Sequence, residues 1–173
     1  MSAPAELVRM LDECGWTVPA PTEHPMTGVA ETRWIALAHL LEAAEAAKAA
    51  GWFYESLTCV DRLDPHGVFE LIVTLERWDV TARVALRLWV PKDQPVPSLA
   101  DVYRVADWNE REVWELFGVA FTGHPRLTWL LLPEGTAFHP LLKSFTAPPP
   151  SIYDDSLTAP TPQDERTGPD ARG

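Results

Sequence analysis

A change in the spacing of apolar residues along the chain constrains its fold more than any other feature. Between residues 68 and 77 the large apolar side chains occupy every second position, and residues 81–90 repeat this alternation. A period of two places one set of side chains on one side of a β-strand. The stretch 52–63 is also rich in aromatic and β-branched residues, which favour strands. These three segments predict an antiparallel meander.

Turn sequences separate these predicted strands. Residues 64–67 (DPHG) fit a tight turn, because proline presets φ and glycine accepts a positive φ. If the second turn lies at residues 78–79, Glu70 falls roughly opposite Arg87 as a complementary cross-strand pair. We expect this pair on a solvated face and the alternating apolar residues on a dry face that helices must cover.

Segments whose apolar residues recur at helical spacing are the predicted helices that cover the dry face. Apolar residues recur at helical spacing over residues 3–13, 31–50 and 107–117, and Gly118 stops the last of these. The predicted fold class is therefore α+β: an antiparallel sheet (a meander) covered on one face by helices, with an irregular C-terminal extension. Residues 1–145 form the predicted domain.

The last 28 residues, 146–173, differ in composition from the rest of the chain. They hold six of its 17 prolines and few large apolar side chains. Such a segment buries too little apolar surface to offset the entropy of ordering it. We expect a Pro-rich, extended tail that becomes ordered only on a partner.

Composition excludes several classes of function. A net charge of −11 argues against nucleic-acid binding, which needs a basic surface. The two cysteines cannot alone build a zinc ribbon or an iron–sulfur cluster, and no two of the five histidines have i, i+4 spacing. No apolar run reaches the roughly 18–20 residues of a membrane span. The N-terminus lacks the features of a signal peptide, so we expect a soluble protein of a reducing compartment.

The helix predicted over 107–117 carries the most informative charges. Val113, Leu116 and Phe117 share one face, and Arg111, Glu112 and Glu115 share the other. The charged face is interpreted as solvated, with a weak i, i+4 ion pair between Arg111 and Glu115. Glu110 projects toward the apolar side. Two interpretations stay open for it: a capping box with Asp107, or a pair with a buried cation.

Nucleophilic catalysis finds no support in the sequence. Cys59 lies inside a predicted strand and is interpreted as a small core residue. No serine occupies a Gly-x-Ser-x-Gly turn. The enzymatic hypothesis that remains is a carboxylate–histidine set, drawn from Glu110, Glu112, Glu115, His124 and His139.

One combination of motifs resembles a known family. The segments are 110–112 (ERE), 115–119 (ELFGV), 123–127 (GHPRL) and 139–145 (HPLLKSF). Spaced in this way, they resemble the C subunit of the proton-pumping NADH–quinone oxidoreductase, respiratory complex I. The likeness is firm over residues 104–145 and looser over the predicted meander.

The resemblance implies a structural subunit of the peripheral arm with no cofactor of its own. NADH, FMN, iron–sulfur clusters and quinone are then expected in partner subunits. The implied partners are the quinone-site subunit and the subunit of the terminal iron–sulfur cluster, at the cytoplasmic face of the cell membrane. The chain would meet the membrane only through the complex. By analogy, the interface would contain Glu110, Arg111, Glu112, Glu115, His124, Pro125, Trp129, His139, Pro140 and Lys143.

The chain departs from the family pattern at positions that usually carry charge. Thr128 and Trp129 stand where a basic pair is usual, Leu142 replaces an arginine and Ser144 an aspartate. These changes put the partner in question more than the fold. Two alternatives therefore stay open: an equivalent subunit of a related membrane-bound hydrogenase or other donor–quinone reductase, and a stand-alone small enzyme using the Glu and His groups.

Overall fold

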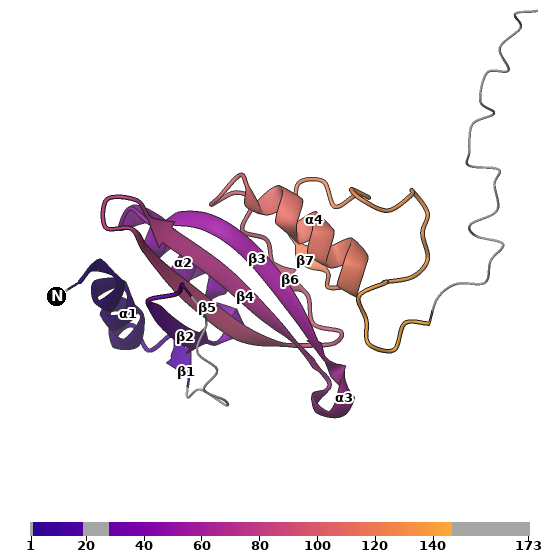
Figure 1. Cartoon of the computed structure of the whole chain (residues 1–173), viewed down its shortest axis with the longest axis horizontal. Helices are drawn as coiled ribbons and strands as arrows, with labels where there is room; N and C mark the ends of the chain where they lie inside the picture. The colour runs from indigo at the N-terminus through magenta and orange to yellow at the C-terminus, as the bar shows by residue number, and fades with distance from the viewer. Residues whose placement is uncertain (1, 19–27, 147–173) are drawn as a thin grey trace, which may run out of the picture.

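The computed structural model of the chain (Figure 1) describes residues 2–18 and 28–146. The expected tail over 146–173 lies, apart from Thr146, outside the described residues. The helices are α1 (Ala3–Glu13), the 3₁₀ turn η1 (Leu37–His39), α2 (Leu40–Ala49), α3 (Leu63–His66) and α4 (Ala106–Phe117). The strands are β1 (Thr17–Val18), β2 (Glu31–Ile35), β3 (Phe53–Arg62), β4 (Val68–Arg77), β5 (Ala82–Pro91), β6 (Val96–Pro97) and β7 (Phe121–Thr122).

A five-stranded sheet with the order β1-β2-β5-β4-β3 forms the centre of the molecule. Its long strands β3, β4 and β5 pair antiparallel, which confirms the predicted meander. Gly67 has a φ of 69° at the end of the first turn, as the turn sequence predicts. The strands β6 and β7 form a separate parallel pair beneath α4.

Helices α1, α2 and α4 pack against this sheet, α3 lies at the tip of the β3–β4 hairpin, and the α+β class is confirmed. In Figure 1, α2 lies behind the strands and α4 lies beyond β3. Apolar residues of α1, α2, α4 and the sheet share one core. Leu11 of α1 and Ala47 of α2 are both fully buried in it. No helix in the described part of the chain is long and apolar enough to cross a membrane.

The helix predicted over 31–50 is only partly correct. Its first five residues form β2, which pairs parallel with β5, and α2 begins only at Leu40. Thr32, Trp34 and Ile35 are β-branched or aromatic and suit a strand. Pairing with the otherwise open edge of β5 favours the strand over the helix for these residues. It also leaves Trp34 only 3% exposed.

The expectation that Glu70 and Arg87 lie on a solvated face is wrong. Their exposures are only 1% and 4%. Glu70 stands opposite Trp89 rather than Arg87, yet Arg87 Nε donates diagonally to Glu70 Oε1 at 2.8 Å. The Arg87 guanidinium lies 4.6 Å from the ring of Trp34. The predicted pair therefore forms, but as a buried ion pair beneath aromatic rings.

Candidate functional site: buried charges of helix α4

Helix α4 carries three charged side chains inside the protein. Glu110, Arg111 and Glu115 have exposures of 1%, 6% and 0%. The interpretation of Arg111 and Glu115 as a solvated face is therefore wrong. The irregular segment that follows β7 folds back over this side of the helix, as Figure 1 shows. Buried charges are stable only when hydrogen bonds replace their water, and the partners of Arg111 and Glu115 come from that segment.

Glu115 is held by backbone amides of the returning segment. Its carboxylate accepts the N–H groups of Leu130 and Leu131 at 2.8 Å each and that of Leu132 at 3.4 Å. A charged acceptor makes such bonds stronger than neutral ones. Residues 130–132 belong to no helix or strand, and the Glu115 carboxylate accepts the N–H bonds that a helix or sheet would otherwise accept.

Arg111 binds backbone carbonyl groups of the same segment. Its Nε donates to the Thr128 carbonyl oxygen at 2.9 Å and its Nη2 to that of Trp129 at 2.6 Å. The guanidinium lies 5.5 Å from the ring of Trp108. The predicted Arg111–Glu115 ion pair is therefore replaced by two separate sets of bonds to the backbone. Together, the two side chains satisfy donors and acceptors over residues 128–132.

Glu110 points to a different segment, the loop that follows β6. It accepts the Leu99 N–H at 2.6 Å and the Ser98 hydroxyl at 2.5 Å. Burial raises the pKa of Glu110 to about 7, although these two hydrogen bonds act in the opposite direction. No side chain caps α4, whose N-cap residue is Val105, so the capping-box interpretation is wrong. The side chain it approaches is His124, whose Nε2 lies 3.9 Å from Glu110 Oε2.

The histidines of the site have structural contacts. His124 Nδ1 accepts the Arg126 N–H at 3.0 Å, and its Nε2 lies 3.2 Å from the Asp107 carbonyl oxygen. These partners place the ring proton on Nε2. His139 Nδ1 lies 2.9 Å from the Glu115 carbonyl oxygen. The carboxylate–histidine set predicted from sequence is thus only partly assembled, at Glu110 and His124.

Gly118 is required where α4 ends. Its φ is +82°, and a Cβ there would lie 2.9 Å from the imidazole ring of His139. A larger residue would therefore be strained by the left-handed backbone and would require the His139 ring to move. The predicted helix stop is confirmed, and it also provides the space in which His139 packs.

Asp61 is a site residue that sequence reasoning missed. Its exposure is 5%, and its Oδ2 accepts the Lys143 N–H at 2.7 Å while its Oδ1 accepts the Leu63 N–H at 2.8 Å. The Leu141 N–H donates to the Leu116 carbonyl oxygen at 3.1 Å. These bonds fasten residues 139–145 to β3 and α4. The available signal was an aspartate at an inward position of a strand.

Helix α4 and the anchored segment present apolar side chains at the surface. Trp108, Leu131 and Leu141 are 57%, 64% and 51% exposed. Trp129 packs against Trp114 with ring centroids 4.9 Å apart and ring planes tilted by 47°, beside a hollow of about 480 Å³. Trp129 and Leu142, which depart from the family pattern, thus pack within this chain; Leu142 lies against the core.

The ten predicted interface residues fall into two groups in the structure. The side chains of Glu110, Arg111, Glu115 and His124 are buried and shape the surface from within. The others retain exposed surface: Glu112, Pro125, Trp129, His139, Pro140 and Lys143. Within residues 2–18 and 28–146, no three His, Cys, Asp or Glu side chains are grouped so that they could hold a metal ion.

The fold and this site define an α+β scaffold whose buried charges organise a loop surface. The family model for the respiratory-chain NADH dehydrogenase 30 Kd subunit matches residues 29–151, so the chain belongs to that family. This confirms the resemblance found from the sequence motifs.

Individual relatives agree with the family assignment. The chain is 43% identical over 77 residues to the NADH-quinone oxidoreductase C subunit of Rhizobium rhizogenes, covering 44% of this chain and 38% of the relative. It is 38% identical over 100 residues to the corresponding C subunit of Acidothermus cellulolyticus, covering 56% of this chain and 52% of the relative. The matches thus span about two fifths to half of these relatives.

Solved structures share the fold. Nqo5, in its trypsin-resistant fragment 1–134, matches with a TM-score of 0.59 and 26% identity over 73% of this chain and all of the fragment. A chain of an archaeal membrane-bound sulfane sulfur reductase matches with a TM-score of 0.68 over 98% of this chain and 100% of its own length. Its identity is 18%, so it shows likeness of fold alone.

Proposed function

We propose that this chain is a structural subunit of the peripheral arm of an NADH–quinone oxidoreductase, supporting electron transfer from NADH to quinone coupled to proton translocation. It holds no cofactor and contributes no catalytic residue. NADH, FMN, iron–sulfur clusters and quinone belong to its partners. The observation that carries this proposal is the use of the buried α4 charges. Arg111 and Glu115 are both committed to backbone groups of the chain itself, which suits a scaffold.

The surface that α4 organises is the proposed interface. It contains the exposed parts of segment 121–145, together with Trp108 and Glu112 on the helix. Exposed aromatic and leucine side chains with a polar rim are typical of protein interfaces. The proposed partners are the quinone-site subunit and the subunit of the terminal iron–sulfur cluster. The tail, residues 146–173, would become ordered on one of them.

The proposed location follows from the proposed assembly. The chain would lie at the cytoplasmic face of the cell membrane and be peripheral, bound only through the complex. The equivalent subunit of a membrane-bound hydrogenase or other donor–quinone reductase is the second candidate. It is favoured by the replacement of the usual charges at Thr128, Trp129 and Leu142 by uncharged side chains.

The experiment is purification of the tagged chain from membranes in mild detergent, with mass spectrometry of its companions. Iron–sulfur and quinone-site subunits with NADH–quinone activity are expected. Hydrogenase subunits would instead support the second candidate. A chain recovered without companions would contradict the scaffold role and favour the enzyme hypothesis.

A variant separates scaffolding from chemistry. Arg111→Ala removes both bonds to the carbonyls of residues 128–129, so we expect less assembled complex but unchanged turnover per assembled complex. Arg104→Ala is the matched control, because Arg104 is exposed just before α4. Normal assembly with slow turnover in Arg111→Ala would contradict the proposal.

A further inference from the structure

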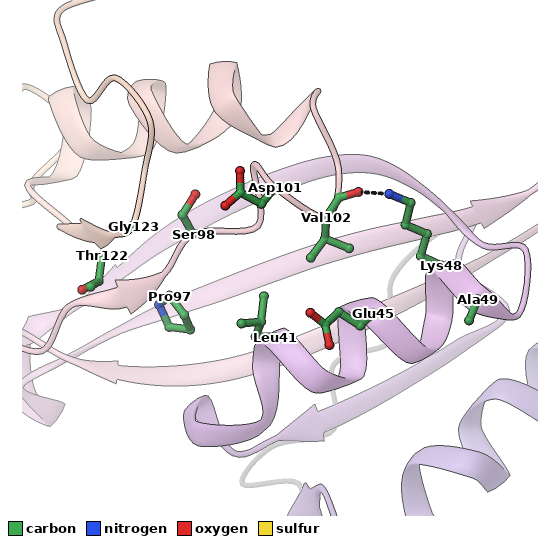
Figure 2. A pocket seen from close by; sticks show the side chains of 10 residues that line it. All are labelled: Leu41, Glu45, Lys48, Ala49, Pro97, Ser98, Asp101, Val102, Thr122 and Gly123. Carbon is green, nitrogen blue, oxygen red and sulfur yellow. Dashed lines mark hydrogen bonds between the residues drawn. The ribbon is translucent and has the colours of Figure 1, made fainter.

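A second surface lies on the side of the β6–β7 pair away from α4. There, an open groove of about 640 Å³ separates α2 from the loop that joins β6 to α4 (Figure 2). None of the ten individually predicted interface residues lines it, although Thr122 and Gly123 at its edge belong to segment 121–145. Its lining consists of Leu41, Glu45, Lys48, Ala49, Pro97, Ser98, Asp101, Val102, Thr122 and Gly123.

Hydrogen bonds within the chain fix the spacing between the two sides of the groove. Lys48 Nζ donates across one end to the Val102 carbonyl oxygen at 2.5 Å, as Figure 2 shows. Behind it, the Tyr103 hydroxyl donates to the Ala44 carbonyl oxygen at 3.2 Å. The start of the loop is held by the hydrogen bonds to Glu110 described above. A site whose walls are fixed in advance loses little entropy when a partner binds.

The groove combines apolar walls with two carboxylates that lack partners among the described residues. Leu41 and Pro97 form apolar wall, and Figure 2 shows the Glu45 carboxylate beside Leu41 on α2 and Asp101 on the opposite loop. Neither carboxylate has a hydrogen bond or an ion pair to another described residue, and Lys48 is committed to a carbonyl oxygen. Both carboxylates are exposed at the groove. Two carboxylates and one ammonium give the lining a net charge of −1, so it favours a positive charge carried on an aliphatic stem.

We propose that this groove is a docking site for a partner protein that inserts a lysine or arginine side chain. The aliphatic stem would lie against Leu41 and Pro97, and the charge would lie between Glu45 and Asp101. Long cationic side chains bury their stems on apolar surface while the charged head stays at its polar rim. The net charge of −11 on this chain also favours approach of a basic partner.

The test is an NMR titration of the full chain with a peptide, acetyl-Gly-Leu-Lys-Leu-Gly-amide. We expect amide shifts at Leu41, Ala49, Val102 and Gly123. The same peptide with norleucine in place of lysine should bind at least fivefold more weakly. The double variant Glu45→Gln/Asp101→Asn should weaken binding of the lysine peptide to a similar extent. The control Asp93→Asn/Glu134→Gln changes the net charge equally at exposed sites outside the groove and should leave binding unchanged.

Each other outcome overturns the proposal. Equal binding of the lysine and norleucine peptides would show an apolar surface that does not recognise charge. Equal binding of spermidine would show a general cation site rather than a protein docking site. Shifts spread over the acidic surface, or equal weakening by the control variant, would show non-specific attraction. Because the titration needs no other subunit, its failure is separate from any failure of the proposed complex.

Discussion

Helices α2 and α4 both pack against the sheet but use different chemistry. The buried surface of α2 contains Leu40 and the small residues Ala43, Ala44 and Ala47, which bring the helix close to the strands. The buried surface of α4 contains Ala106 and Val113 together with Glu110, Arg111 and Glu115. The buried side chains of α2 are all apolar, whereas those of α4 include charged groups that bind the backbone of irregular loops.

The difference follows from what each helix must satisfy. The strands beneath α2 satisfy their own backbone groups through the sheet ladder, so an apolar helix face suffices. The segments beside α4 have free N–H and C=O groups that no ladder satisfies. Glu115 and Arg111 supply acceptors and donors for them. Charged side chains therefore replace secondary structure where the chain needs an ordered but irregular surface.

The largest expected effect comes from removing the acceptor for the loop. Glu115→Ala leaves the N–H groups of residues 130–132 without their acceptor, and we expect a loss of about 3 kcal/mol or more in the free energy of unfolding. Hydrogen exchange at these amides should rise. Glu112→Ala, at a half-buried position of the same helix, should change stability by less than about 1 kcal/mol. Unchanged exchange in Glu115→Ala would break the comparison with α2.

The buried carboxyl of Glu110 gives a pH-dependent effect. Its pKa is about 7 in the folded chain against an ordinary 4.5, so the folded state binds the proton more tightly than the unfolded state. The free energy of unfolding should therefore fall as pH rises from about 4.5 through 7, by up to about 3 kcal/mol.

Glu110→Gln should abolish that fall, because the amide stays neutral and can still accept the Leu99 N–H. Denaturant unfolding between pH 5 and 8 measures the difference. The exposed control Glu134→Gln should keep the slope of the unaltered chain. An equally steep slope in Glu110→Gln would place the titrating group elsewhere.

Packing under α2 should respond to volume rather than to charge. Ala47 is fully buried, and Ala47→Leu forces extra methylene and methyl groups into a filled core, which should cost about 1–3 kcal/mol. Exchange at residues 130–132 should stay as in the unaltered chain. Ala49→Leu, at an exposed position of the same helix, should cost less than about 0.5 kcal/mol. Loop exchange that rises in Ala47→Leu would show that the two helices are not independent.

Breaking a surface ion pair should have the smallest effect on the free energy of unfolding. It provides the reference against which the effects of the buried charges are compared. Arg9 Nε and Glu13 Oε1 are 3.5 Å apart on α1, with both side chains more than half exposed. Arg9→Ala should change the free energy of unfolding by no more than about 0.5 kcal/mol. Thermal unfolding measures it, and a loss near that of Glu115→Ala would mean that burial is not what makes the α4 charges matter.

The meander was predictable because its signal is local. Alternation within residues 68–77 and 81–90 determines which side chains share a face, and no distant residue is needed to read it. The strand β2 was not predictable in this way, because Trp34 also fits the apolar stripe of the helix that follows. Only the available edge of β5 selects the extended form.

The motifs of α4 identified the family, but the local contacts predicted for their charges were largely wrong. Arg111 and Glu115 have the spacing of a surface ion pair, yet each binds backbone groups 15–18 residues further along the chain. Glu110 likewise binds the loop that precedes α4. Such partners belong to irregular segments, which leave no periodic pattern in the sequence.

The sequence by itself determined the α+β class, the meander, the glycine stop of α4 and the family. These depend on periodicity, on backbone preference and on spaced motifs within one segment. Only the tertiary structure decided that the charges of α4 are buried, that residues 31–35 are a strand, and that a groove faces away from α4. Burial and pairing depend on which distant segments come together, because it is their free backbone groups and open edges that select the final contacts.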